Sequence, residues 1–120
     1  MRRKSKRILD ASCLLQIAKN LTSSDALFLY ENLNQCSRSI FYEIIFNVLY
    51  NIGRMQMSKY KINCVRKLIS PYRKEYENLA ISSVSEHKKR KIIRKQIVNG
   101  IMRKLISIVA PAVSNIASEN

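Results

Sequence analysis

The sequence predicts an all-α fold, a small helical domain of five to six helices with a basic C-terminal helix. Apolar residues recur at intervals of three and four along most of the 120 residues, which is helical spacing. The chain holds only two Gly and two Pro, too few to support a set of β-hairpin turns. Its length corresponds to one domain, and 47% hydrophobic residues suffice for a modest core.

Five helices are expected before the basic one. They should span about 10–20, 25–35, 38–52, 58–69 and 72–80. Asp10, Ser37 and Ser58 are placed to cap three of them, and Gly53 fits the left-handed residue that ends the third. The third helix is apolar nearly all round, so we expect the core to form around its Ile44 and Val48. Other core candidates include two phenylalanines, Phe28 and Phe46.

The last expected helix has two unlike halves. Ser83 and Glu86 have the spacing of a capping box at its start. Six basic residues fall between positions 87 and 96, and apolar side chains line one side from 97 to 109. Asn99-Gly100 is a weak point, and Pro111 ends or kinks the helix. We therefore divide the chain into a basic arm (1–8), a helical core domain (9–84), a basic then amphipathic helix (85–110) and a tail (111–120).

The net charge of +14 is unevenly distributed. Residues 54–104 hold fifteen basic and three acidic residues, a net charge of +12, whereas residues 8–53 have a net charge of −2. Such asymmetry indicates a polyanionic partner, either nucleic acid or an anionic membrane surface. Phosphate neutralisation by Lys and Arg carries no sequence information, and the chain has no zinc-finger or RNP motif that would read bases, so the expected binding is independent of sequence. The predicted nucleic-acid-binding residues are Arg2, Arg3, Lys4, Lys59, Lys61, Arg66, Lys67, Lys88, Lys89, Arg90, Lys91, Arg94, Lys95, Arg103 and Lys104.

The apolar side of the last helix predicts a second contact surface. Large aliphatic side chains do not remain in water, because burying each contributes about 1.5–3 kcal/mol. The domain's own core, a partner protein and a bilayer are three alternative surfaces for it. The predicted partner or membrane face consists of Ile97, Val98, Ile101, Met102, Leu105, Ile106, Ile108 and Val109.

No catalytic constellation, metal site or cofactor motif is expected. With one His and three widely spaced Cys, the chain lacks the ligand spacing of zinc sites. Cys36 and Cys64 are expected to be small core residues, as in a protein of a reducing, intracellular compartment. No apolar run reaches the ~20 residues that span a bilayer, and no secretory signal is recognised.

A set of short motifs is spread over about residues 12–116. They are Asn47-Val48-Leu49, Met57-Ser58, Tyr72, Leu79-Ala80, Lys89-Arg90, Gln96 with Gly100, Leu105-Ile106 and Pro111. This set resembles the small basic proteins encoded by Maverick/Polinton-type DNA elements and adintoviruses. The end of the chain is also similar to the adenovirus core peptide called mu or protein X. One departure is Asn99-Gly100, where the Maverick/Polinton family usually has two adjacent glycines.

This resemblance implies a core protein that condenses the DNA of a viral or virus-like element. It implies packaging in the virion and a host nucleus or virus factory as location. From the residues themselves we expect a non-enzymatic protein that binds double-stranded DNA, with a capsid protein as a further partner. Two alternatives rest on the residues themselves. The first is a membrane-active amphipathic protein, and the second is a helical adaptor that docks on a capsid protein.

Overall fold

Seven α-helices and two short 3₁₀ turns make up residues 6–118, the part of the chain that the computed structural model describes. No strand occurs within these residues, so the predicted all-α fold is confirmed. The elements are α1 (Lys6–Ala18), α2 (Ser23–Glu31), α3 (Gln35–Tyr50), η1 (Ile52–Met55), α4 (Lys59–Ile69), η2 (Ser70–Tyr72), α5 (Arg73–Ala80), α6 (Glu86–Val98) and α7 (Ile101–Ser118).

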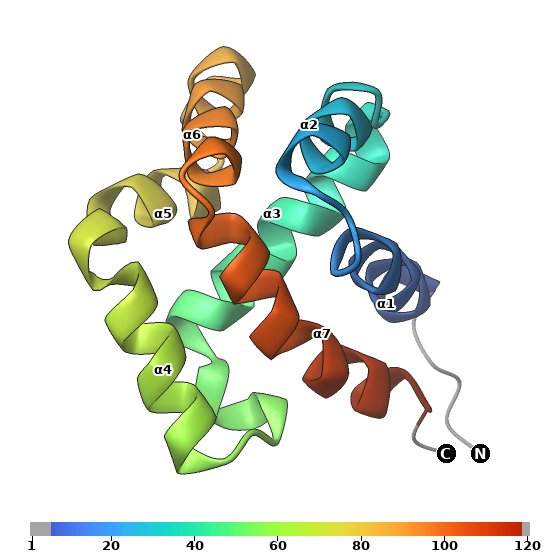
Figure 1. The fold of residues 1–120 in the computed structure, drawn as a ribbon, viewed down its shortest axis with the longest axis vertical. Helices are drawn as coiled ribbons and strands as arrows, with labels where there is room; N and C mark the ends of the chain where they lie inside the picture. The colour runs from blue at the N-terminus through green and yellow to red at the C-terminus, as the bar shows by residue number, and fades with distance from the viewer. Residues whose placement is uncertain (1–5, 119–120) are drawn as a thin grey trace.

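Helix α3 lies at the centre, with α7 crossing in front of it (Figure 1). Ile44 and Val48 are buried at 8% and 3% exposure, which confirms the predicted centre of the core. Side chains of α1, α3 and α7 surround one small internal gap, so these helices share a single core. The prediction was wrong for Phe28 and Phe46, which are 71% and 43% exposed on the outer sides of α2 and α3.

The remaining helices flank this centre on two sides. In Figure 1, α1 and α2 lie on one side of α3 and α7, while α4 and α5 lie on the other. Helix α1 packs along α7, α2 packs against α6, and α5 packs against α3. Helices α6 and α7 contribute Ile93, Ile97 and Leu105 to the same core as α3. The residues of the segment at 85–110 therefore share the core of residues 9–84.

Polar side chains cap four helices, though not always at the predicted residue. The hydroxyl of Ser58 accepts from the backbone N–H of Lys61 at 3.2 Å, as predicted for α4. Asn34 caps α3 in place of Ser37. Ser85 caps α6 in place of Ser83. Each of these two caps lies within three residues of the predicted one, the usual uncertainty of a helix boundary. Thr22 caps α2.

Two predicted helix ends differ from the structure in other ways. Helix α1 begins at Lys6, so Asp10 is an exposed residue within it and residues 6–8 of the predicted basic arm are helical. Gly53 does not end α3 in the left-handed conformation, because it lies inside η1. Gln56 is the left-handed residue there, with φ of 57°.

The predicted single helix at 85–110 is two helices that meet at Asn99-Gly100. Gly100 has φ of +81°, a left-handed conformation that interrupts the helix and that glycine adopts without steric cost. The side chain of Asn99 then accepts from the N–H of Ile101 at 3.0 Å and starts α7. The basic half and the apolar half of the predicted helix consequently point in different directions (Figure 1).

Pro111 lies inside α7, and residues 112–118 of the predicted tail are helical. Proline has no N–H, so it removes the hydrogen bond that the carbonyl of Ser107 would otherwise receive. Pro111 itself is exposed, whereas its neighbours Ala110 and Ala112 are buried in the protein. Packing of the buried side therefore carries the helix past the proline.

Candidate nucleic-acid interface

Half of the six basic residues on α6, namely Arg90, Arg94 and Lys95, are paired with carboxylates within the fold. Arg94 lies 2.8 Å from the carboxylate of Glu31 on α2. Lys95 lies 3.1 Å from Glu75 on α5. These ion pairs join α6 to α2 and to α5. They are exposed and contribute about 1 kcal/mol or less each, but they place negative charge beside the predicted phosphate contacts.

Lys89 is the predicted contact that the structure places inside the protein. Its side chain is 8% exposed, and its ammonium lies 4.9 Å from the centroid of the Tyr42 ring. The negative face of an aromatic ring attracts a cation in this position. A lysine with so little exposed surface offers little contact to a phosphate, so Lys89 does not belong to the exposed basic surface of the protein.

The same region holds a polar network built around Glu86. Its carboxylate accepts from the guanidinium of Arg38 at 2.9 Å and from the hydroxyl of Tyr42 at 3.0 Å. Arg90 lies 3.7 Å away, and the hydroxyl groups of Tyr42 and Tyr30 are 2.6 Å apart. Burial raises the pKa of Tyr42 and of Tyr30 above the usual 10.0. These groups hold α2, α3 and α6 together.

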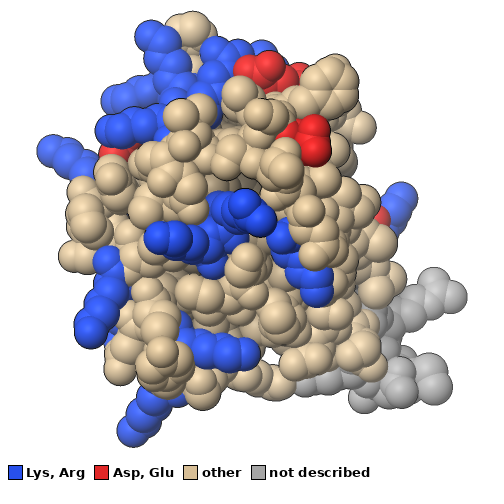
Figure 2. All heavy atoms as spheres, in the orientation of Figure 1, with Lys and Arg blue, Asp and Glu red and all other residues tan. Residues whose placement is uncertain are grey.

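A second group of predicted contacts remains free. It forms the α4–α7 surface, defined by six side chains on α4 and on the start of α7. Each is exposed, and no carboxylate of residues 6–118 lies within ion-pair distance of any of them. Figure 2 shows Lys and Arg over α4 and α7, whereas the Asp and Glu atoms lie mostly toward the α6 and α2 end. The six are Lys59, Lys61, Arg66, Lys67, Arg103 and Lys104.

A shallow open groove between α4 and α7 brings half of this surface together. The groove is lined by Lys67 from α4 and by Arg103 and Lys104 from α7. In the sequence, Lys67 lies 36 positions before Arg103. The other lining residues are Cys64, Leu68, Ser107 and Ile108, so the groove contains no carboxylate. Three cations without a counter-ion in one groove create a positive potential that attracts anions.

The start of α4 adds to this potential. Lys59 and Lys61 lie in its first turn, which contains no acidic residue. The N-terminal end of a helix already carries a partial positive charge, so two cations there oppose helix stability by roughly 0.3–1 kcal/mol each. A bound polyanion would relieve that repulsion.

The other predicted contacts lie elsewhere. Lys88 and Lys91 are exposed on α6 without an ion pair to any residue of 6–118, and they do not line the groove. Arg2, Arg3 and Lys4 lie outside the described residues. The structure thus brings together part of the predicted set, on α4 and α7.

The predicted partner or membrane face packs mainly on the protein's own core. Five of its residues are at most 8% exposed, and Ile101 and Ile108 are half-buried. Val98 is 71% exposed, because the break at Gly100 turns it away from the side chains of α7. Helix α7 is long and apolar enough to cross a membrane by length and composition alone, but it would have to leave the core to do so. The five residues of the predicted face that are at most 8% exposed are Ile97, Met102, Leu105, Ile106 and Val109.

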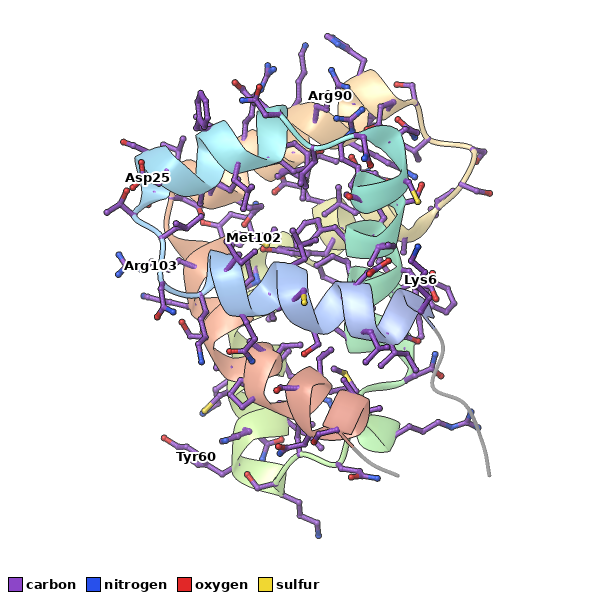
Figure 3. All side chains as sticks on the ribbon, turned by 90° about the vertical axis from the view of Figure 1, so that its right-hand side faces the viewer. Lys6, Asp25, Tyr60, Arg90, Met102 and Arg103 are labelled. Carbon is purple, nitrogen blue, oxygen red and sulfur yellow. The ribbon has the colours of Figure 1, made fainter. Side chains whose placement is uncertain are left out.

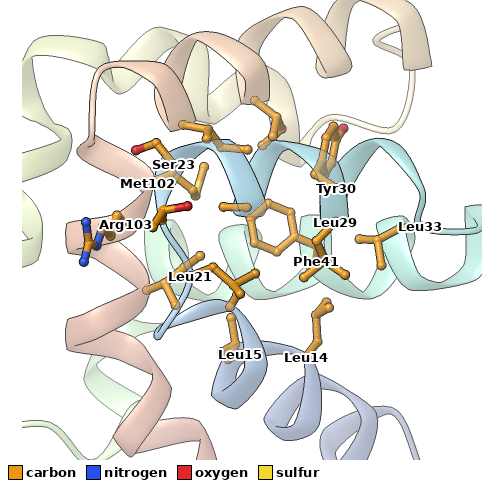
Figure 4. Close-up of a pocket in the computed structure, with 16 residues that line it drawn as sticks. Leu14, Leu15, Leu21, Ser23, Leu29, Tyr30, Leu33, Phe41, Met102 and Arg103 are labelled. Carbon is orange, nitrogen blue, oxygen red and sulfur yellow. The ribbon is translucent and has the colours of Figure 1, made fainter.

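An apolar pocket lies between α1, α2 and α7, beside the basic groove. Figure 4 shows Leu14, Leu15 and Met102 on its walls and the guanidinium of Arg103 pointing away from it. Its free volume of about 40 Å³ is far below the roughly 300 Å³ at which ligand pockets begin. The pocket is a packing defect of the core. Because Arg103 points away from it (Figure 4), the guanidinium remains part of the α4–α7 surface.

Metal-binding side chains do not gather in the described part of the chain. No group of three or more His, Cys, Asp and Glu side chains occurs there. The thiols were predicted to be core residues, yet Cys13 and Cys36 are exposed and Cys64 is half-buried at the groove.

Sequence reasoning missed Tyr60. This tyrosine is 78% exposed on α4. The signal was its position round the helix, since the buried Val65 and Ile69 lie about 140° and 180° round the axis from Tyr60 at about 100° per residue.

Fold and surface together define a small all-helical protein with one basic face that its own carboxylates do not neutralise. No family model, curated protein or solved structure matches the chain.

Proposed function

We propose that this protein binds DNA without catalysing a reaction and independently of sequence, by neutralising phosphates at the α4–α7 surface. The observation that carries the proposal is the groove in which Lys67, Arg103 and Lys104 meet without a carboxylate. On α6, by contrast, Arg94 and Lys95 are paired with carboxylates of the same protein. The fold therefore neutralises cations on α6 and leaves those of the α4–α7 surface free for a ligand.

Lack of sequence preference follows from the chemistry of the surface. Its charged groups are lysines and arginines on an open, shallow groove, and such groups contact phosphates far more readily than base edges. Nothing in the sequence corresponds to a zinc finger or another base-reading motif. Affinity should therefore come from released counter-ions and depend strongly on salt.

The biological setting that we propose rests on the resemblance to Maverick/Polinton-type and adintovirus proteins. In that setting the chain is a virion core protein that condenses the DNA of a viral or virus-like element. It acts in the host nucleus or virus factory and contacts a capsid protein during packaging. The basic surface supplies the DNA contact that such a role needs.

The first prediction concerns the salt dependence of duplex binding. We expect the logarithm of the association constant to fall linearly with the logarithm of salt concentration. Replacing Lys67, Arg103 and Lys104 together with Ala should reduce the slope by up to about 0.9 for each lost phosphate contact. The loss of affinity should be the same for unrelated duplex sequences, as measured by fluorescence anisotropy.

The matched control removes the same charge elsewhere. Lys74, Lys88 and Lys91 are exposed outside the groove and form no ion pair with residues 6–118. Replacing these three with Ala should change the salt slope less than the groove variant does. Equal losses for both triple variants would show that the α4–α7 surface is not the binding site, and weak salt dependence in the unmodified protein would refute the proposed function.

A further inference from the structure

Tyr60 is the most exposed of the large hydrophobic side chains in the described chain, at 78%. It lies in the first turn of α4, between two exposed lysines. Its ring makes no aromatic or cation–π contact with residues 6–118. A tyrosine in this position contributes little to the core, so its ring is available to a ligand.

The position of Tyr60 links it to the basic groove. Lys67 follows seven residues later, two turns along α4, which places both side chains on the same side of the helix. Lys67 also lines the groove with Arg103. Figure 3 shows Tyr60 and Arg103 projecting from the same side of the molecule, from α4 and α7 respectively. An exposed ring and a row of free cations therefore share one face.

We propose that this face also binds single-stranded nucleic acid, with the ring of Tyr60 stacked on an unpaired base. The cations of the groove contact the sugar–phosphate backbone next to that base. This inference rests on the proposed function and adds a partner for the same site. Aromatic rings beside basic grooves serve this purpose because every base has a flat face, so stacking tolerates any sequence. A duplex keeps its bases stacked on one another and gives the ring little to contact.

A tryptophan at position 60 provides a direct readout, since the chain contains no Trp. In Tyr60→Trp, the single indole should be quenched when a 20-nucleotide oligothymidylate is added at low salt, and much less by a duplex of equal length. Phe28→Trp is the matched control. Phe28 is 71% exposed, but it lies on α2, at the other end of the molecule from α4 in Figure 1. Its emission should stay unchanged.

Affinity measurements complete the test. Tyr60→Ala should weaken oligothymidylate binding by about 5- to 150-fold, the range for losing one stacked base, and should leave duplex affinity within about twofold. Tyr60→Phe should bind as tightly as the unmodified protein. The salt slope should not change in either variant, because no charge is lost.

Three results would overturn this inference. Unchanged oligothymidylate affinity in Tyr60→Ala would exclude stacking, and salt-dependent duplex binding would then leave the proposed function intact. Equal losses for single strand and duplex would assign Tyr60 to a backbone contact instead. Failure of the unmodified protein to bind either nucleic acid would refute the proposed function and this inference together. Thermal melting of the variants should match the unmodified protein, since Tyr60 is exposed.

Discussion

Glu86 compensates one arginine of α3 and one arginine of α6 at the same time. Its carboxylate is the ion-pair partner of Arg38 at 2.9 Å and of Arg90 at 3.7 Å. Arg38 is only 7% exposed, and its other acceptors, the carbonyl of Leu33 and the side-chain oxygen of Gln35, carry no charge that could replace the carboxylate of Glu86. Breaking a buried ion pair by removing one partner is costly, because it leaves the other charge uncompensated.

The second prediction concerns this network. Glu86→Gln should lower the free energy of unfolding by about 3 kcal/mol, because Arg38 stays buried without its counter-charge. Glu77→Gln is the control. Its carboxylate pairs with Arg73 at 3.6 Å on the surface, and its loss should cost less than about 1 kcal/mol. Urea denaturation of the two variants measures the difference, and equal losses would contradict the role assigned to Glu86.

The sequence could not predict which cations stay free, because the deciding contacts are long-range. Arg38 and Glu86 are separated by 48 positions, and Lys95 and Glu75 by 20. Periodicity describes which way a side chain points on its own helix, but it carries no information about a carboxylate on another helix. The predicted binding set therefore included Lys89, which is buried, and Arg94 and Lys95, which are paired.

At the scale of helices, periodicity and composition predicted most of the architecture. Apolar spacing gave the helices around α3, and Ser58 was the predicted cap of α4. The junction at Gly100 was the main difference. A glycine inside a helical pattern costs only about 1 kcal/mol, so the pattern alone does not distinguish a weak point from a break. Whether the glycine only weakens the helix or interrupts it depends on tertiary packing. Here α7 packs along α1 and runs in a different direction from α6 (Figure 1).

The third prediction tests that junction. Gly100→Ala should lower the free energy of unfolding by about 1–2 kcal/mol, because φ of +81° places a Cβ in the left-handed region. Gly53→Ala is the control, since Gly53 lies in η1 without a positive φ and an added Cβ there meets no atom within 4 Å. We expect that variant to be neutral or up to about 1 kcal/mol more stable. A Gly100→Ala protein that unfolds like the unmodified one would contradict the assigned backbone conformation.

At the scale of the whole molecule, the apolar side chains and the free cations of α7 lie on different sides of the helix, and this decides which side chains a partner can contact. The aliphatic face predicted on the last helix is largely buried in the domain's own core, and the free cations lie on the other side of α7. The sequence left three destinations for that face, because helical periodicity identifies an apolar side without identifying what covers it.

The fourth prediction uses two residues of that face. Leu105→Glu should destabilise the protein by several kcal/mol, because Leu105 is 2% exposed and the glutamate would be buried without a partner. Val98→Glu should melt like the unmodified protein, because Val98 is 71% exposed. If Leu105→Glu kept its melting temperature while vesicle leakage or assembly with a partner was lost, the face would belong to that surface and not to the core.

The packing of α1 along α7 has a consequence for how the protein is made. A ribosome delivers α1 before α7, so the part of the apolar side of α1 that packs on α7 has no cover until more than 80 further residues have been synthesised. The emerging chain carries exposed aliphatic side chains and free lysines together during that time, a combination prone to aggregation and to capture by polyanions. Chaperones that shield α1, or prompt completion of α7, would then set the yield of folded protein.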